Sequence, residues 1–469
     1  MPDQRGTAGL FSPVFGRGGG AIGDAEWVQA LLDAEAGLAR ALERAGLAPA
    51  GAGKQVTAAA RAADFDVAEF GTGLTGNPVP GLARALARRV AREAAPAVHR
   101  GATSQDILDT AMMLLARRSI DAVTDDLALA AAAAARLAVA HRRTIMIGRT
   151  LLQQAVPVTF GLVAAGWLTA LDEARAGLAA ARRRLAVQFG GAAGTLASLG
   201  ADGPGVAALL AQELDLALPV LPWHTDRLRI LDAGTAMART TAVLGKIARD
   251  ITLLAQNEVG EVREGDPAGA GARPAPEGGI RRGGSSAMPH KRNPVAAIAV
   301  LGCTRQVPGL LATLVASAEH EHQRAAGAWH AEWEPFTALL RLTGSAAAWG
   351  TELLSGLVVD APRMAANLAA TEGLPLAEHV TALLSGEMGG ARAHDLVARA
   401  SARAVGAGLP LRDVLLGVAE LADALAAAGI TPEQVEAALE PAGYLGATDV
   451  FIDAALAAHS AHFQTQITD

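Results

Sequence analysis

Residues Gly283 to Pro294 read GGSSAMPHKRNP, and this stretch is the most informative part of the chain. Its two glycines allow backbone conformations that other residues avoid, whereas its prolines fix φ. Such a segment can present backbone N–H groups, the hydroxyls of Ser285 and Ser286, Lys291 and Asn293 to a small anion. A bare Gly-Ser run is ordinarily a flexible linker. Linkers do not carry MPHKRNP, so we predict a binding loop.

The composition indicates a mostly α-helical protein of several lobes. The chain has 469 residues, of which 51% are hydrophobic and only 3% aromatic. The abundant Ala, Leu, Arg and Glu favour helices, and small alanines let helices approach closely. The net charge of −7 argues against nucleic acid as a partner.

A cytoplasmic location is expected, without a membrane anchor. Cys303 is the only cysteine, so it forms no internal disulfide, and we expect it to be a small buried residue. Residues 1–23 lack the apolar core of a signal peptide. The alanine-rich run Ala128–Ala135 is too short to span a bilayer.

Apolar residues spaced three and four apart predict a series of long helices. We expect an all-α chain of three lobes: residues 1–102, a central long-helix bundle at 103–345 that holds loop 283–294, and a smaller helical lobe at 346–469. The expected helices cover residues 24–46, 79–95, 104–142, 158–188, 227–262 and 294–317, with a kink at Pro308 in the last. A helix that is apolar nearly all round, such as 158–181, needs neighbours on every side, so we infer that the bundle oligomerises.

The segment Gly265–Gly284, rich in Gly, Ala and Pro, directly precedes the binding loop. We predict a mobile loop that lies over a site. A disordered surface insert without a role is the alternative.

Three further stretches carry candidate anion-binding residues. The first reads HRGATSQD from His99 and places the hydroxyls of Thr103 and Ser104 at the start of a helix, where they can cradle a carboxylate or simply cap the helix. The second reads GRTLLQQAVPVTFG from Gly148, and the third reads EHQR from Glu321. His320 and His322 are two residues apart and would lie on different helix faces, so we expect no metal site and assign Arg324 to a carboxylate.

These stretches closely resemble the signature regions of the aspartase/fumarase superfamily, and its 3-carboxy-cis,cis-muconate cycloisomerase branch in particular. So do QFGGAAGT from Gln188, PWHT from Pro222 and GAWHAEW from Gly327. The resemblance runs from about Leu10 to Ala402. It implies an all-α homotetramer whose central bundle builds each active site from three subunits. It also implies a small dicarboxylate or tricarboxylate substrate, with no metal or organic cofactor.

The resemblance assigns roles residue by residue. Ser285 corresponds to the general base that takes the proton from the carbon next to a carboxylate, which requires a strongly lowered pKa. Lys291 and Asn293 correspond to residues that hold the carboxylate and stabilise the aci-carboxylate intermediate. The complete set of predicted substrate-binding residues is His99, Arg100, Thr103, Ser104, Arg149, Thr150, Gln153, Gln154, Ser286, Met288, Lys291, Asn293 and Arg324.

Two positions depart from the family pattern. Many superfamily lyases have a histidine at the position of Leu151, and this histidine acts as the general acid for the leaving group. Cycloisomerases tend instead to carry a histidine where Gln154 stands. Glutamine cannot supply a proton, so the leaving group must depart as a stable anion, and either a carboxylate, as in lactone opening, or nitrite meets this condition. We therefore interpret the chain as a lyase that eliminates from a substituted succinate, first of all nitrosuccinate to fumarate and nitrite in an antibiotic pathway. A lactonising cycloisomerase is the alternative, and a non-catalytic structural homologue is a remote one.

Overall fold

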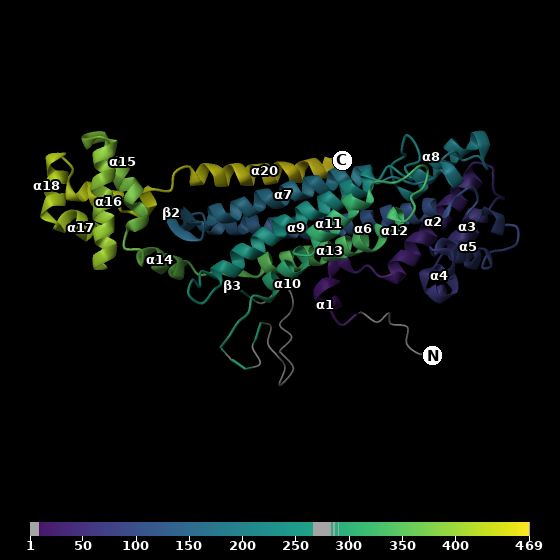
Figure 1. The fold of residues 1–469 in the computed structure, drawn as a ribbon, viewed down its shortest axis with the longest axis horizontal. Helices are drawn as coiled ribbons and strands as arrows, with labels where there is room; N and C mark the ends of the chain where they lie inside the picture. Colours follow the sequence, from purple (N-terminus) through teal and green to yellow (C-terminus); the bar gives the residue numbers. More distant parts are fainter. Residues whose placement is uncertain (1–8, 266–282, 285–286, 289, 469) are drawn as a thin grey trace. The chain divides into compact units, whose positions relative to one another are not determined.

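The structure is a computed structural model that describes residues 9–265, 283–284, 287–288 and 290–468. It is mostly helical, which confirms the predicted fold class (Figure 1). Ser285, Ser286 and nearly all of the predicted loop 265–284 lie outside the described residues. The role of that loop therefore stays a prediction.

The chain divides into two compact units. The first comprises Met1–Leu129, Glu173–Ala248 and Val295–Glu352, and the second comprises Ala130–Asp172, Arg249–Pro294 and Leu353–Asp469. The helices of the first unit are α1 (Ser12–Phe15), α2 (Asp24–Arg44), α3 (Ala52–Ala59), α4 (Thr72–Thr75), α5 (Val79–Ala87), α8 (Gly203–Leu214), α10 (Val295–Thr304), α11 (Val307–Ser317) and α12 (Ala328–Ala331). The second unit holds strands β1 (Ile145–Thr150), β2 (Gln153–Thr159), β3 (Val262–Glu264) and β4 (Leu357–Val359), and helices α14 (Ala361–Ala369), α15 (Ala377–Met388), α16 (Gly390–Ala407), α17 (Leu411–Gly417), α18 (Ala419–Ala427), α19 (Pro432–Ala438) and α20 (Thr448–Thr468). Four of the five unit boundaries fall within α6 (Ser104–Ala140), α7 (Phe160–Arg184), α9 (Leu228–Leu254) and α13 (Trp333–Ser355), and the fifth lies between Pro294 and Val295, where α10 begins.

The four helices that contain unit boundaries are the long helices of the chain. Helix α6 has 37 residues, α7 has 25, α9 has 27 and α13 has 23. Helices α6 and α7 agree closely with the predicted ranges 104–142 and 158–188, whereas α9 ends at Leu254, before the predicted end at 262, where strand β3 begins. The fourth, α13, runs through residue 345, where a lobe boundary was expected.

In the first unit α2 packs against α3 and α8 (Figure 1). Its apolar face, with Leu31, Leu38 and Leu42, is fully buried. A Cβ on Gly37 would lie 2.6 Å from Leu214 Cδ2, so the glycine permits the close approach of α8. The N-cap is Gly23, and Glu26 folds back to accept from the Gly23 N–H at 2.8 Å.

Two predicted helices are shorter than expected. Helix α5 ends at Ala87 and not at residue 95. Just after the end of the helix, the Arg89 guanidinium donates to the carbonyls of Ala85 and Asp64. The predicted helix 294–317 is divided into α10 and α11, because Pro308 lies in the first turn of α11. Proline at that position starts a helix readily but cannot continue one from the preceding turn.

A β-hairpin that the sequence analysis did not predict precedes α7 in the second unit. Strands β1 and β2 pair antiparallel, with Thr150 opposite Gln153. The two residues of the turn, Leu151 and Leu152, have φ of 51° and 66°. Their side chains are 96% and 72% exposed. A hairpin turn of two left-handed residues normally carries Asn and Gly, so two leucines here are a costly choice.

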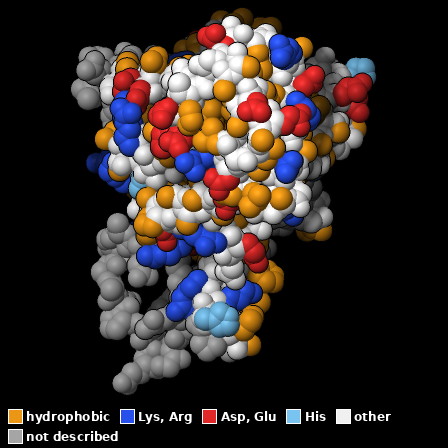
Figure 2. All heavy atoms as spheres, turned by 90° about the vertical axis from the view of Figure 1, so that its left-hand side faces the viewer, with side chains coloured by type: hydrophobic (Ala, Val, Ile, Leu, Met, Phe, Trp, Pro, Cys, Tyr) orange, Lys and Arg blue, Asp and Glu red, His pale blue; other side chains and the backbone are white. Residues whose placement is uncertain are grey.

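Helices α15 to α19 of the second unit surround a small apolar core of their own. Val380, Leu384, Leu411 and Val435 are among its fully buried residues. Figure 2 looks onto these helices and shows acidic, basic and apolar side chains interspersed. Helix α20 returns alongside α7, where His459 Nδ1 lies 2.8 Å from Asp172 Oδ2 (Figure 1).

Cys303 lies in α10 and is fully buried, as expected. Burial raises the pKa of its thiol to about 12. Because the thiolate is the reactive form, Cys303 is inert at neutral pH. Its role is therefore in packing.

Candidate active site

The first turn of α6 presents two half-buried hydroxyl residues in the first unit. Ser104 begins the helix, and Thr103 precedes it. The Asp106 carboxylate accepts from the Thr103 backbone N–H at 2.9 Å, which closes the first turn. The free N–H groups of a helix start favour an anion, so the hydroxyls stand where a carboxylate is stabilised.

Asp106 also ties three separate stretches of sequence together. Its buried carboxylate accepts from the backbone N–H groups of Gly190 and Gly191, both at 2.9 Å, and lies 2.7 Å from His224 Nε2. A Cβ on Gly190 would lie 2.8 Å from His224 Cε1, so only glycine fits there. The stretches QFGGAAGT and PWHT, which had no assigned chemistry, therefore hold the turn that carries Thr103.

Arg324 lies at the same turn of α6. Its guanidinium donates to Gln105 Oε1 at 2.8 Å and to the Ala192 carbonyl at 2.9 Å. The side chain is half-buried, so it retains access to a ligand. The structure thus brings Thr103, Ser104 and Arg324 together, and their role in binding a carboxylate stays a prediction.

His99 is held in the first unit by a carboxylate that the sequence analysis missed. Glu35, fully buried in α2, accepts from the His99 backbone N–H at 2.8 Å and lies 2.7 Å from His99 Nδ1. This double contact stabilises the left-handed backbone of His99, whose φ is 57°. Burial lowers the pKa of His99, but the hydrogen bond and charge of Glu35 outweigh it, so the pKa is raised above 6.5. Arg100, by contrast, is exposed and donates to the Leu47 carbonyl.

Glu35→Gln is expected to lower the pKa of His99 and shift the pH dependence of anion binding. Protonated His99 favours an anion, so affinity for a small dicarboxylate such as fumarate should fall as pH rises through the His99 pKa. In the variant that fall should occur at lower pH. The His99–Glu35 interaction itself stabilises the fold fully below pH 6.5 and less as pH rises through the raised pKa.

The measurement is an NMR titration of the His99 ring alongside fumarate affinity from pH 5 to 9. Asp172→Asn is the matched control, because it removes a carboxylate beside a different buried histidine, His459. An unchanged midpoint for His99 in the Glu35 variant would contradict the role of Glu35.

The predicted residues of the hairpin lie in the second unit. Arg149 forms a two-fold ion pair with Glu261, at 2.9 Å and 2.7 Å, and Asn367 Nδ2 donates to the same carboxylate at 2.8 Å. Glu261 is fully buried, so this pair anchors the end of β1. Thr150, Gln153 and Gln154 follow as exposed residues around the turn.

The signature loop, also in the second unit, is closed at its base. The Asn293 backbone N–H and side-chain Nδ2 both donate to the Gly283 carbonyl, at 2.8 Å and 3.2 Å. Gly283 has φ of 67°, and a Cβ there would lie 2.4 Å from the Asn293 carbonyl oxygen. Only glycine fits that position. Lys291 and Met288 are exposed on the loop, and Ser285 and Ser286 lie outside the described residues.

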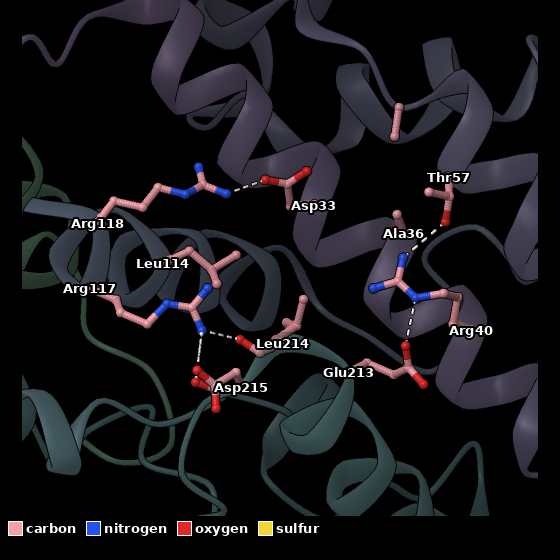
Figure 3. Close-up of a pocket in the computed structure, with 11 residues that line it drawn as sticks. Asp33, Ala36, Arg40, Thr57, Leu114, Arg117, Arg118, Glu213, Leu214 and Asp215 are labelled. Atoms are coloured by element: carbon pink, nitrogen blue, oxygen red, sulfur yellow. Dashed lines mark hydrogen bonds and ion pairs between the residues drawn. The ribbon is translucent and has the colours of Figure 1, made fainter. Parts of the chain in front are cut away.

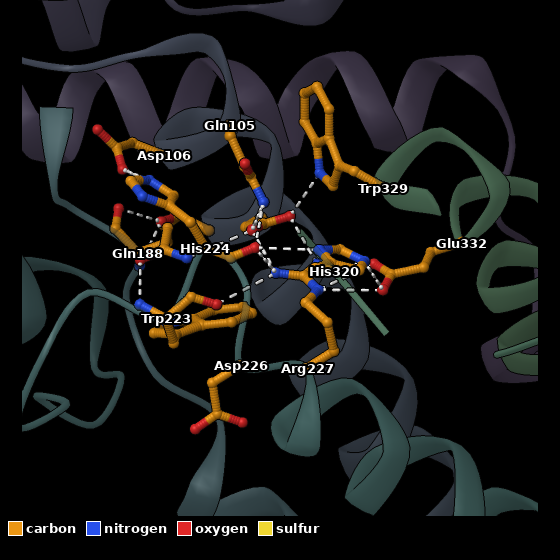
Figure 4. A network of polar contacts seen from close by, with 12 residues as sticks. Gln105, Asp106, Gln188, Trp223, His224, Asp226, Arg227, His320, Trp329 and Glu332 are labelled. Atoms are coloured by element: carbon orange, nitrogen blue, oxygen red, sulfur yellow. Dashed lines mark hydrogen bonds and ion pairs between the residues drawn. The ribbon is translucent and has the colours of Figure 1, made fainter. Parts of the chain in front are cut away.

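A buried charge cluster lies next to the first turns of α6 (Figure 4). Arg227 pairs with Asp109 at 2.8 Å on one side and with Glu332 at 2.7 Å on the other, and all three side chains are fully buried. Burial would lower the pKa of Arg227, but the two carboxylates raise it. His320 completes the cluster, because its Nε2 lies 3.2 Å from Glu332 Oε1.

The described residues contain no group of three or more His, Cys, Asp or Glu side chains arranged to hold a metal ion.

The charge cluster was not predicted from the sequence, because its members are far apart in the chain. Asp109 and Arg227 are 118 positions apart, and Arg227 and Glu332 are 105 apart. The stretch GAWHAEW was a usable signal, because it supplies both Glu332 and Trp329.

A separate cavity of about 270 Å³ lies between α2, α6 and α8 of the first unit (Figure 3). Its charged residues are already paired. Arg40 Nε lies 2.7 Å from Glu213 Oε2, and Arg118 pairs with Asp33. The cavity contains none of the predicted site residues.

Comparison with known proteins places this chain among lyases. A family model described as "Lyase" matches residues 22–309. A 3-carboxy-cis,cis-muconate cycloisomerase of Bradyrhizobium diazoefficiens is 47% identical over 439 residues, which is 92% of this chain and 94% of that protein. A nitrosuccinate lyase of Streptomyces davaonensis is 45% identical over 466 residues, with 96% and 94% covered. The crystal structure of a 3-carboxy-cis,cis-muconate lactonizing enzyme from Pseudomonas putida matches with a TM-score of 0.86 and 38% identity, covering 96% of this chain and 99% of that one.

Proposed function

This chain belongs to the lyase family of the aspartase/fumarase superfamily, and we propose that it makes or breaks a carbon–heteroatom bond β to a substrate carboxylate. The observation that carries the proposal is the start of α6, where Thr103 and Ser104 lie in sequence next to Gln105 and Arg324 donates to the Gln105 side chain. Two hydroxyls, a helix start and a guanidinium are suited to hold a substrate carboxylate.

The lactonisation of a carboxymuconate is the first candidate reaction. We place it before nitrosuccinate elimination, which the sequence analysis put first. The reason is that the Bradyrhizobium diazoefficiens relative is named a cycloisomerase and the matching crystal structure is named a lactonizing enzyme. In this reaction a substrate carboxylate oxygen bonds to the carbon β to a second carboxylate. The resulting enediolate then takes a proton at its α carbon. Ser285 would donate that proton in the lactonising direction and take it in the reverse direction. Lys291 and Asn293 would stabilise the enediolate.

Nitrosuccinate elimination is the second candidate, and Gln154 in the hairpin favours it, because cycloisomerases tend to carry a histidine at that position. Leu151 and Gln154 are exposed there, and neither side chain can supply a proton. Nitrite leaves as a stable anion and needs none. The α proton passes to Ser285, the carbon–nitrogen bond breaks, and fumarate remains. The nitrosuccinate lyase relative covers 96% of this chain.

A homotetramer with sites shared between subunits is part of the proposal. The apolar stretch Val295–Ser317 supports it, because its mean hydropathy is 1.5 and only 33% of its most apolar window is buried in the single chain. The side chains of Ile298 and Val315 are 52% and 57% exposed. By length and composition this stretch could also cross a membrane, but it is divided into α10 and α11. Other copies of the chain would cover it.

The candidates are separated by supplying the purified protein with 3-carboxy-cis,cis-muconate and with nitrosuccinate in parallel. We expect lactone from the first and no nitrite from the second. Nitrite without lactone would reverse the order of the candidates. Neither product from a folded protein would contradict the proposed function.

A further inference from the structure

The amide of Gln105 has only one orientation that satisfies its surroundings. Gln105 is fully buried, and its Nε2 donates to Asp109 Oδ2 at 3.1 Å and to the His224 carbonyl at 2.9 Å. Both of these partners are acceptors. The carbonyl end of the amide must therefore point the other way, where Oε1 accepts from Arg324 at 2.8 Å.

Asp109 is itself held by two further residues, Arg227 and Trp329. Arg227 donates to both of its oxygens, at 2.8 Å and 3.1 Å, and Trp329 Nε1 donates at 3.0 Å. A carboxylate bound in this way cannot rotate without losing several charge-assisted hydrogen bonds. It therefore provides a fixed acceptor for the Gln105 amide.

Arg227 is fixed in turn by the far side of the cluster. Its guanidinium donates to both Glu332 oxygens, at 2.7 Å and 3.0 Å. His320 lies between two acceptors, with Nδ1 at 3.3 Å from the His224 carbonyl and Nε2 at 3.2 Å from Glu332. The chain of contacts thus runs from buried Glu332 through Arg227, Asp109 and Gln105 to the half-buried Arg324.

We propose that this buried cluster positions Arg324 for carboxylate binding, with Gln105 as the positioning residue that transmits the constraint. The inference rests on the proposed function, because it assigns Arg324 to a substrate carboxylate. An arginine side chain loses considerable rotamer freedom when it is ordered. A guanidinium that is already held before the ligand arrives loses less on binding, which improves affinity.

Gln105→Met is the test variant, because methionine has similar length but neither donates to Asp109 nor accepts from Arg324 as an amide does. For whichever of carboxymuconate or nitrosuccinate the wild type converts, we expect KM to rise about tenfold and kcat to change less than about threefold. A crystal structure of the variant should show the Arg324 guanidinium displaced from its wild-type position.

Thr110→Val is the matched control. Thr110 is equally buried on the same helix, and its hydroxyl bonds the Gln188 carbonyl and N–H at 3.1 Å and 2.9 Å, without touching Arg324. It should lose stability but keep KM within about twofold of the wild type. An unchanged KM in the Gln105 variant, or an equal rise in the Thr110 variant, would overturn the inference.

The two proposals fail separately. If the wild type converts neither substrate, the proposed function fails, and the crystal structure of the Gln105 variant decides the inference alone. Arg324 remaining in place there would refute the positioning role. A displaced guanidinium would support it.

Discussion

Ser285→Ala is expected to lower turnover by about 10²–10⁴-fold, because a positioned general base contributes that much to proton transfer. Ser285 is predicted to take or return the proton at the carbon next to the carboxylate. Alanine removes the hydroxyl with little change in size, so neither the fold nor the assembly should change. The loss should appear in kcat more than in KM, since the proton moves only in the transition state.

The measurement is steady-state turnover with size-exclusion chromatography as the check on assembly. Ser385→Ala is the control, because the Ser385 hydroxyl donates to the Thr381 carbonyl of its own helix at 2.6 Å. That variant should keep wild-type turnover. Full activity in the Ser285 variant would refute its role as base.

Arg227→Met is expected to lower the free energy of unfolding by about 3–5 kcal/mol, as for other broken buried ion pairs. The reason is that Asp109 and Glu332 would remain fully buried without their shared cation. The loss should be visible as a lower urea midpoint. Arg412→Met, which removes an exposed partner of Glu436, should shift the midpoint little.

A compensated variant separates charge from packing. Combining Arg227→Met with Asp109→Asn and Glu332→Gln removes both carboxylates along with the cation. Part of the stability should return, because no uncompensated charge remains. If the single Arg227 variant were as stable as the Arg412 variant, the cluster would not stabilise the fold.

The long helices could be predicted from sequence because apolar spacing is a local signal. Helix α6, predicted at 104–142, is observed at Ser104–Ala140. The hairpin was not predictable in the same way. Strand β2 is a short mixed run that leads directly into α7, and its turn carries Leu151 and Leu152 where a hairpin signal would be Asn and Gly.

The residue types of the candidate site could be predicted from the sequence, but the residues that hold them in position could not. Thr103, Ser104 and Arg324 were identified from motifs, and the structure brings them to one turn of helix. Glu35, which holds His99, is 64 positions away in the chain. Nothing local distinguishes a buried glutamate from a solvated one on an amphipathic helix. Such partners become visible only when the helices are packed.

In the hairpin, the residues that hold the fold are different from the exposed residues that can contact another molecule. Its backbone costs about 1–2 kcal/mol for each left-handed leucine, yet both side chains extend away from the core. The anchor at Arg149 and Glu261 lies behind the turn and does not depend on which residues form the tip. Evolution can therefore exchange residues 151 and 152 without repacking the interior. The residues retained at positions 151 and 152 would then depend on the molecule or subunit that contacts the turn. They would not depend on the stability of this chain.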